Sequence, residues 1–220
     1  MAKNVRVTNM EIWLVRHGTT IANLEGRIQG TLEFPLSPLG REEASSLAYR
    51  LKNQAFSAIL SSNLLRARET SRIIVSLRKS PIPIYLPLIQ EYSWGIIEGL
   101  TRKEIGEKYP SLMRELTQDF HHTVIPGAEG LDCLFKRVKK FYDLLSRFEK
   151  TVKFRKPLLI VSHGRFLHAF LLYFLRYDFG GFWPFPLHPS SLSILESDFS
   201  KNRQLKLFND TCHLKSSRQP

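Results

Sequence analysis

Residues 158–164 read Leu158-Leu159-Ile160-Val161-Ser162-His163-Gly164. A short, continuous apolar run with two β-branched residues is typical of a strand that is buried on both faces of a sheet. Polar residues follow at once, so we expect the strand to end near Ser162 and to leave His163 at its carboxyl end. The apolar segment Phe166–Leu175 is then expected to form a helix.

The same order of strand, polar residues and helix recurs toward the N-terminus. Glu11–Val15 is expected to be a short buried strand that stops before Arg16, and Ala58–Leu60 a second one that stops before Ser61. The expected helices are Ser37–Gln54, capped by Ser37 with Pro38 at its first position; Leu64–Leu77, with Ile73, Ile74 and Leu77 inward; and Leu131–Glu149. Ile82–Leu86 is expected as an edge strand, and Leu192–Leu195 and Leu205–Phe208 are expected to complete the sheet.

This alternation predicts an α/β fold of three layers, in which helices cover both faces of a mostly parallel sheet. We expect a single domain over residues 1–220, because a chain of 220 residues can bury one sizeable core. Residues 90–130 contain several Gly and Pro and are interpreted as a lid-like insertion. Residues 211–220 are polar and are expected to form a loose tail.

Composition indicates an ordinary globular protein, with 43% hydrophobic and 24% charged residues. No apolar run reaches the ~20 residues that span a bilayer, and the first ten residues lack a signal-peptide core, so a cytoplasmic protein without membrane contact is expected. The net charge of +12 is spread along the chain. It favours anionic ligands in general over specific nucleic-acid binding. Cys133 and Cys212 are far apart in sequence, and we expect reduced thiols.

Polar residues that follow three predicted strands point to phosphate chemistry. They are Arg16-His17-Gly18, then Ser61-Ser62 leading to Arg66, then Ser162-His163-Gly164. In sheets of this kind, ligands bind beyond the carboxyl ends of the strands. Guanidinium groups match phosphate oxygens, and Gly18 and Gly164 would let backbone approach a ligand. The sequence therefore predicts a phosphoryl pocket at that edge.

Five segments, in order, resemble motifs of the histidine phosphatase superfamily, also called phosphoglycerate mutase-like. They are Leu14–Thr20 (LVRHGTT) with Asn23, residues 30–40 (GTLEFPLSPLG), residues 61–70 (SSNLLRARET), residues 91–100 (EYSWGIIEGL) and residues 161–164 (VSHG). The resemblance spans nearly the whole chain. Residues 94–105 (WGIIEGLTRKEI) are similar to the cofactor-independent phosphatase branch.

The resemblance implies a role for each matching residue. His17 would attack phosphorus and form a phosphohistidine, and Glu91 would give a proton to the leaving oxygen and later take one from water. Arg16, Arg66 and His163 would hold the transferring oxygens, with Asn23 and Gly164 in support and Arg27 touching substrate or phosphate.

No cofactor or metal is implied, since fixed cationic donors can replace Mg²⁺. One charge pair at 4 Å contributes ~4 kcal/mol at an effective dielectric near 20.

Several residues have two interpretations. Glu129 could face substrate or stabilise the start of a helix. Pro189 stands where the family often has Asn, although His188 could still lie near the pocket. His121-His122 could suggest a metal, but no partner at ligand spacing lies nearby. His168 is expected to be packed in a helix and His213 to lie in the tail. Phe182, Trp183 and Phe185 could line a pocket or belong to the core.

Two other functions compete with a phosphatase that acts on a small anionic phosphorylated substrate. A mutase would share the first chemical step and return the phosphoryl group to another hydroxyl. A binding protein would retain the pocket without turnover. The sequence names no substrate and leaves a homo-oligomer possible.

Overall fold

Two buried strands form the centre of the fold. In the computed structural model, which describes residues 9–77, 81–119, 122–152, 156–177, 185–199 and 202–214, β1 (Met10–Arg16) and β4 (Leu158–Ser162) pair in parallel. Their register sets Arg16 opposite Ser162. Within the described residues they belong to a six-stranded sheet of order β3-β2-β4-β1-β5-β6.

The sheet is mostly parallel, as predicted, and its antiparallel pairs lie on one side. β2 (Ala58–Ser61) pairs in parallel with β4 and with the edge strand β3 (Ile84–Tyr85), which is shorter than expected. On the other side, β5 (Leu192–Ser197) is antiparallel to β1, and β6 (Arg203–Asp210) is antiparallel to β5.

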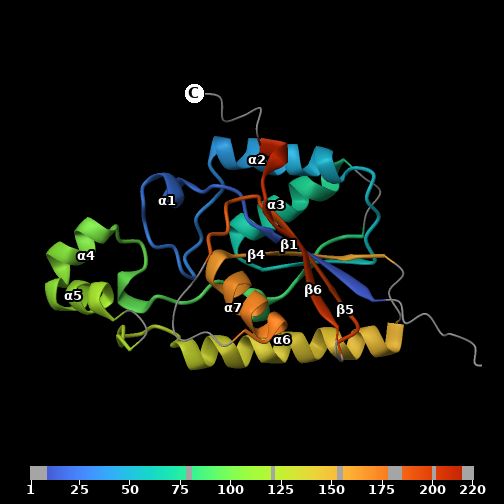
Figure 1. The fold of residues 1–220 in the computed structure, drawn as a ribbon. Helices are drawn as coiled ribbons and strands as arrows, with labels where there is room; N and C mark the ends of the chain where they lie inside the picture. The colour runs from blue at the N-terminus through green and yellow to red at the C-terminus, as the bar shows by residue number, and fades with distance from the viewer. Residues whose placement is uncertain are drawn as a thin grey trace, which may run out of the picture.

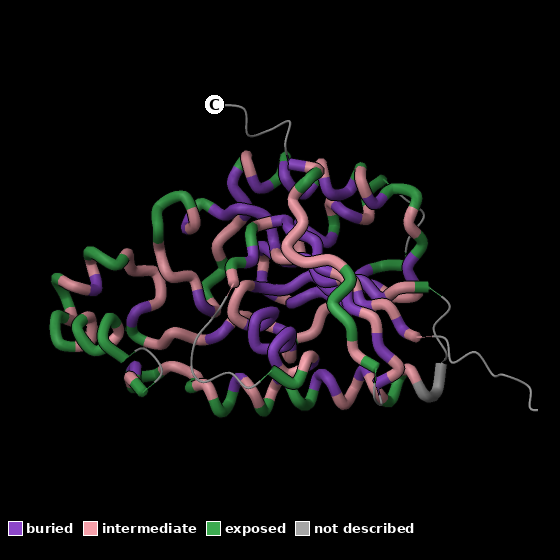
Figure 2. Tube along the Cα trace, in the orientation of Figure 1, coloured by how far each residue is buried: buried purple, intermediate pink, exposed green. Residues whose placement is uncertain are grey.

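Helices cover both faces of the sheet (Figure 1), which confirms the predicted three layers. α2 (Pro38–Leu51) and α3 (Leu65–Ser76) lie on one face, and α6 (Leu131–Val152) and α7 (Gly164–Leu175) lie on the other. Side chains along a strand alternate between faces. Accordingly, Leu158 and Ile160 pack with α6 and α7, whereas Leu159 and Val161 pack with α2 and α3. Figure 2 shows buried residues concentrated in the central strands and in α7.

The ends of the helices follow local sequence. Ser37 caps α2 by accepting from the Gly40 N–H at 3.1 Å, with Pro38 at the first helical position, as expected. The prediction that Leu77 faces inward from this helix is wrong, because α3 ends at Ser76 and Leu77 is 54% exposed. Two of the residues on the buried face of α3 are instead Arg66 and Thr70.

Residues between β3 and α6 lie outside the sheet. They include the short helices η1 (Pro87–Ile89) and η2 (Gly95–Ile97), then α4 (Arg102–Lys108) and α5 (Pro110–Gln118), which stand to one side in Figure 1. Ile97, Ile105 and Ile125 form a small core there. That these residues act as a lid stays a prediction.

The C-terminal residues are more ordered than the sequence suggests. η3 (Cys212–Leu214) follows β6, and Leu214 is buried. His213 Nδ1 lies 3.1 Å from Arg50 Nη1, and its Nε2 lies 3.0 Å from the Ser190 carbonyl. The expected loose tail therefore does not include residues 211–214, and residues 215–220 lie outside the described part of the chain.

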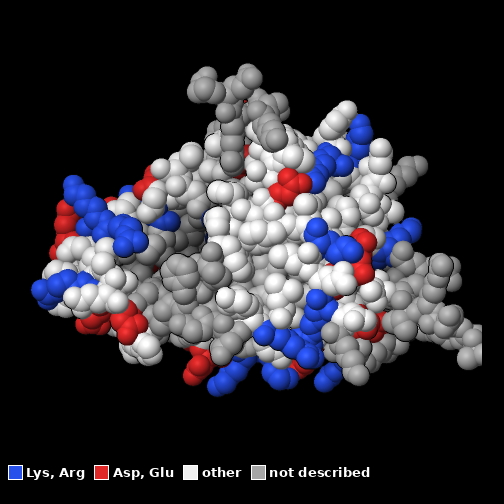
Figure 3. All heavy atoms as spheres, in the orientation of Figure 1, with Lys and Arg blue, Asp and Glu red and all other residues white. Residues whose placement is uncertain are grey.

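Charged side chains are dispersed over the surface, as their spread along the sequence predicts. On the face drawn in Figure 3, basic side chains lie near α4, along α6 and beside β5 and β6, with acidic ones between them. Cys133 and Cys212 are free and exposed. In the described ranges, no helix combines the length and the apolar character that crossing a bilayer requires.

Candidate active site

The ends of β1 and β4 bring two distant histidines together. Because Arg16 is opposite Ser162, the next residues, His17 and His163, leave neighbouring strands at the same edge. Their ring centroids are 5.1 Å apart, and both residues are buried. The sequence-based expectation that these two imidazoles share one site agrees with this geometry.

Hydrogen bonds fix the protonation of His17. Its Nδ1 lies 2.8 Å from the Gly18 carbonyl, which can only accept, so Nδ1 carries the proton and donates. Nε2 then keeps its lone pair and accepts from Arg66 Nε at 3.3 Å. Burial, followed by Arg66 and Arg16, holds the pKa of His17 well below its usual value. His17 is thus a neutral imidazole whose unprotonated Nε2 faces a guanidinium group.

Arg66 is fully buried in the first turn of α3. Its Nη1 donates to the Leu32 carbonyl at 2.8 Å and its Nη2 to the Gly30 carbonyl at 2.7 Å. Burial lowers the pKa of Arg66 to about 10, which leaves it cationic at neutral pH.

Arg16 reaches the same site from the end of β1. It donates through Nη1 to the Leu187 carbonyl, while its buried Nε has no hydrogen-bond partner among the described residues. Burial lowers the pKa of Arg16 against the opposing effect of Glu91 and Glu43. A buried donor without a hydrogen-bond partner costs free energy, so the Nε–H of Arg16 is suited to bind an anion.

His163, which is expected to hold transferring oxygens together with Arg16 and Arg66, is not a fixed cation as those arginines are. Burial, together with Arg66, His17 and Arg16, holds its pKa well below the usual value. Neither of its ring nitrogens has a hydrogen-bond partner in the described structure. His163 is therefore a neutral imidazole with one N–H that it can donate to an anionic oxygen.

Glu91 lies over the start of α7. Its Oε1 accepts from the backbone N–H of Arg165 at 3.0 Å and of Phe166 at 3.2 Å. His163, the N-cap residue, makes no side-chain cap bond, so the Glu91 carboxylate takes that part. A side chain on Gly164 would stand 3.8 Å from Glu91 Oε2 and 3.7 Å from Arg16 Cζ, so Gly164 leaves both groups open to the pocket.

Arg137 of α6 supports the loop that carries Glu91. Its Nη1 donates to the carbonyls of Leu88 at 2.9 Å and Gln90 at 3.0 Å, and its Nη2 donates to that of Glu91 at 3.3 Å. Glu129 pairs with Arg137 at 2.6 Å and 2.9 Å through two nitrogens. The two interpretations of Glu129 were a contact with substrate and stabilisation of a helix start. Its carboxylate instead pairs with the half-buried Arg137.

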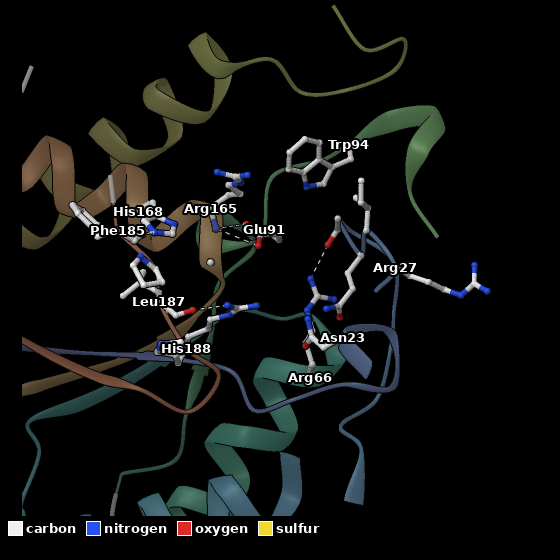
Figure 4. A pocket seen from close by; sticks show the side chains of 16 residues that line it. Asn23, Arg27, Arg66, Glu91, Trp94, Arg165, His168, Phe185, Leu187 and His188 are labelled. Carbon is white, nitrogen blue, oxygen red and sulfur yellow. Dashed lines mark hydrogen bonds between the residues drawn. The ribbon is translucent and has the colours of Figure 1, made fainter. Parts of the chain in front are cut away.

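Of these residues, Arg16, Arg66, Glu91 and Gly164 line a pocket of about 630 Å³. Figure 4 shows Glu91 near its middle, with Arg66 and Asn23 on one side and Arg165 and Trp94 on the other. Asn23 Oδ1 accepts from the Thr20 N–H at 3.1 Å, within the capping box of the short helix α1 (Ile21–Leu24). Arg27 lines the pocket, but its guanidinium points outward in Figure 4 and bonds Glu25 at 2.6 Å and Glu104 at 2.7 Å.

The loop before β5 reaches the pocket although Pro189 replaces Asn. His188 and Phe185 line the cavity, and the Ser190 N–H donates to the Arg16 carbonyl at 3.0 Å. His168 is buried in α7, as expected, and its Nε2 bonds the Phe185 carbonyl. Phe182, Trp183 and His121 lie outside the described residues.

Three contributors were missed by sequence reasoning. Buried Glu43 accepts from the Thr19 N–H at 2.9 Å, Thr70 accepts from the Gly18 N–H at 3.1 Å, and Arg165 lines the pocket. Glu43 precedes Leu47 and Leu51 at spacings of four residues, so a carboxylate on an inward helical stripe was the available signal. The role expected for Gly18 also changes, since a side chain there would stand 2.5 Å from the Gly40 carbonyl oxygen. Gly18 makes room for protein backbone.

Metal ligation has little support among the described side chains. No cluster of three or more His, Cys, Asp or Glu suited to a metal ion occurs among them. His122 instead pairs with Asp119 at 2.7 Å on the exposed surface.

Fold and site together define an α/β protein with two buried histidines beside an arginine-lined pocket at the carboxyl edge of its sheet. The family model described as histidine phosphatase superfamily (branch 1) matches residues 12–211. The chain belongs to that superfamily, which confirms the resemblance.

Named relatives include both phosphatases and mutases. The chain is 31% identical over 205 residues to phosphoserine phosphatase 1 of Hydrogenobacter thermophilus, covering 93% of this chain and 94% of that protein. It is 31% identical over 161 residues to a 2,3-bisphosphoglycerate-dependent phosphoglycerate mutase of Cytophaga hutchinsonii, covering 73% and 75%. The crystal structure of the alpha-ribazole phosphatase from Shigella flexneri is similar with a TM-score of 0.83 at 27% identity, covering 92% and 97%.

Proposed function

We propose that this protein hydrolyses a small anionic phosphomonoester through a phosphohistidine on His17. The observation that carries the proposal is the state of His17, a neutral imidazole with Nδ1–H bound to Gly18 and a lone pair on Nε2 beside the guanidinium of Arg66. A neutral imidazole can attack phosphorus, and two displacement steps let one pocket serve both halves of the reaction.

In the first step, the Nε2 lone pair forms the P–N bond and the ester P–O bond breaks. The leaving oxygen takes a proton from Glu91. In the second step, water attacks phosphorus and gives a proton back to Glu91, while the P–N electrons return to Nε2. The products are the alcohol and inorganic phosphate.

Arg16 and Arg66 supply the charge that a metal supplies in many phosphoryl-transfer enzymes. The transition state spreads charge over the equatorial oxygens, so positioned cations account for much of the catalysis. The neutral N–H of His163 adds a donor, with Asn23 and Gly164 in support at the pocket. We propose that no metal and no cofactor is needed. The ion pairs of Arg27 give it a smaller part in contacting substrate.

A mutase is the second candidate, because a phosphoglycerate mutase is among the relatives. Its phosphohistidine would transfer to a second hydroxyl and not to water. We favour hydrolysis, since the phosphatase relative matches nearly the whole of both chains while the mutase matches about three quarters of each.

The test is a panel of phosphomonoesters with a chelator present, comparing the wild-type protein with His17→Ala. We expect free phosphate from the wild type and none from the variant. We also expect a protein-bound phosphate that is stable to alkali, lost in acid and absent in His17→Ala. Interconversion of 2- and 3-phosphoglycerate without phosphate release would favour the mutase. Ligand binding without either reaction would indicate a binding protein.

The cytoplasmic location and the lack of specific nucleic-acid or membrane binding stay predictions, and a homo-oligomer stays possible as the sequence left it. A salt-dependent affinity for duplex DNA without phosphatase activity would contradict the assignment as a whole.

A further inference from the structure

Glu98 is a half-buried carboxylate on the short segment between η2 and α4. Its Oε1 accepts from the Thr31 N–H at 3.0 Å and from the Trp94 N–H at 2.8 Å, and its Oε2 accepts from the Thr31 hydroxyl at 3.0 Å. Neither Glu98 nor Thr31 is among the described residues that line the pocket. The phosphoryl-transfer steps therefore leave this carboxylate without an assigned part.

The peptide group between Gly30 and Thr31 joins Glu98 to Arg66. Its N–H, from Thr31, donates to Glu98 Oε1, and its carbonyl, from Gly30, accepts from Arg66 Nη2 at 2.7 Å. In a trans peptide the N–H and the C=O point in opposite directions, so this group lies between an anion and a cation with its dipole matched to both. Hydrogen bonds in such a chain polarise and strengthen one another.

The same turn fixes the guanidinium at a second point. The Leu32 carbonyl, one residue beyond Thr31, accepts from Arg66 Nη1 at 2.8 Å. Gly30 has a φ of +52°, and a Cβ there would lie 1.9 Å from Glu98 Oε1, so glycine is needed for the carboxylate to come this close. Thr31, which Glu98 holds by two groups, thus lies between the two carbonyls that bond Arg66.

Backbone bonds hold the segment of Glu98 beside this turn. The Gly99 N–H donates to the Ile28 carbonyl at 2.7 Å, and the Ile28 N–H donates to the Leu100 carbonyl at 2.9 Å. These bonds do not involve the side chain of Glu98. A substitution there should therefore leave the two segments paired and change only what the carboxylate holds.

Glu98 also supports the charge of Arg66. Burial lowers the pKa of Arg66 to about 10, and Glu98 acts against that shift together with Glu91 and Glu33. A buried cation without compensating negative charge is destabilising. Because Arg66 Nε lies 3.3 Å from His17 Nε2, any displacement of the guanidinium changes the surroundings of that nitrogen.

We propose that Glu98 is a positioning residue, which fixes Arg66 through the Gly30–Thr31 peptide group so that the guanidinium can bind the transferring phosphoryl oxygens. Three of the five N–H groups of Arg66 bond His17, Gly30 and Leu32, and the other two can bind those oxygens. The inference rests on the proposed function, because Arg66 affects turnover only if it binds the phosphoryl group.

Two substitutions of Glu98 separate its hydrogen bonds from its charge. We expect Glu98→Ala to lower kcat/KM by about 10- to 100-fold, since a displacement of ~1 Å can cost about 100-fold. Glu98→Gln keeps an oxygen for the two backbone N–H groups and an amide for the Thr31 hydroxyl, so its activity should fall between that of Glu98→Ala and that of the wild type. The loss should be equal with an alkyl phosphate and with p-nitrophenyl phosphate, because Arg66 acts on phosphoryl oxygens and not on the leaving group.

Thr31→Val tests the connection toward Arg66 by itself. It removes the hydroxyl bond to Glu98 and leaves the bond from the Trp94 N–H in place. We expect kcat/KM to fall by about 3- to 10-fold, and Thr31→Ser, which keeps the hydroxyl, to stay near the wild type. If circular dichroism shows that Glu98→Ala does not fold, this pair and Glu98→Gln still test the proposal.

Affinity for inorganic phosphate, measured by calorimetry, gives a readout that needs no turnover. We expect the Kd to rise about tenfold in Glu98→Ala. In an Arg66→Gln background, Glu98→Ala should lower kcat/KM less than about threefold, because two residues that act as a unit are not additive. Glu107→Ala removes an exposed carboxylate from α4 and is the matched control, which should change neither quantity.

The outcomes separate the two proposals. Unchanged phosphate affinity in Glu98→Ala, full additivity of the Glu98 and Arg66 substitutions, or a loss seen only with the alkyl phosphate would overturn the positioning role while hydrolysis stands. If the wild type forms no phosphohistidine and releases no phosphate from any phosphomonoester, the proposed function itself fails.

Discussion

Arg66 donates its Nε–H to Nε2 of His17 across 3.3 Å, and that Nε2 is the nitrogen left unprotonated by the bond between Nδ1 and Gly18. One arginine thus lies beside the lone pair that would attack phosphorus in the proposed reaction, and supplies positive charge next to it. The remaining nitrogens of Arg66 bond the carbonyls of Gly30 and Leu32, so the guanidinium is held in place by backbone from a different segment.

Replacement of Arg66 should reduce activity by more than the loss of its positive charge accounts for. We expect Arg66→Gln to lower kcat/KM by about 100-fold or more, the size seen when one preorganised donor to a developing anion is lost. Arg66→Lys keeps the charge but cannot reach His17 and both carbonyls together, so it should recover little. The measurement is steady-state kinetics on any accepted phosphomonoester, with circular dichroism as the check on folding. Full activity in Arg66→Lys would show that geometry is unimportant here.

The buried histidines should make the fold sensitive to acid. Burial holds the pKa of His17 and of His163 below the usual value near 6.5, so between the folded and unfolded values the unfolded chain binds more protons. Stability is therefore lost as pH falls below about 6.5. The expected slope is up to about 1.4 kcal/mol per pH unit for each histidine.

Urea unfolding between pH 7 and pH 5 measures this slope. We expect His163→Asn to unfold with a shallower pH dependence than the wild type, because one of the two groups is gone. Cys133→Ser, at an exposed position, is a control that should keep the wild-type slope. The same slope in His163→Asn and in the wild type would contradict the prediction.

Arg137 should act on catalysis through Glu91. Arg137→Met removes the bonds to the carbonyls of Leu88, Gln90 and Glu91 and breaks the pair with Glu129, so the acid loses its support. An alkyl leaving group needs a proton from that acid, whereas nitrophenolate leaves without one. We expect the phosphorylation step to slow at least tenfold with an alkyl phosphate and little with p-nitrophenyl phosphate.

Pre-steady-state measurement of the first turnover isolates that step from hydrolysis of the phosphoenzyme. Glu91→Gln should show the same dependence on the leaving group, and Lys140→Met, an exposed residue of the same helix, should show none. Equal slowing with both substrates in Arg137→Met would indicate a general loss of structure and not a positioning role.

The glycine at the start of α2 should be indispensable to the fold. A side chain on Gly40 would lie 1.9 Å from the Thr19 carbonyl oxygen, in the loop that follows His17. We expect Gly40→Ala to destabilise by about 3 kcal/mol or more, since backbone must move. Gly106→Ala in α4 is the contrast, because its side chain would stand 3.8 Å from Met113 and should stabilise the helix by ~0.5–1 kcal/mol. Thermal unfolding of both variants checks the difference in sign.

Local sequence patterns are enough to predict the fold class and the residues at the carboxyl edge of the sheet. Apolar runs that end at Arg16 and Ser162 define strand ends, and neighbouring parallel strands end together, so His17 and His163 follow from local patterns. The start of α2 at Ser37 follows from the same kind of signal, a capping residue, whereas the helix ends at Leu51 and not at the expected Gln54.

How these groups are charged and held in place depends on contacts that form only in the folded protein. The tautomer of His17, the lowered pKa of His163 and the support of Glu91 by Arg137 depend on backbone carbonyls and buried charges from segments far apart in sequence. Arg165 was overlooked for the same reason, since nothing local shows that its side chain meets Trp94 beside the pocket. Hydrophobic periodicity reports which face of an element is buried, but the partners of a buried polar group are set by what packs against that face.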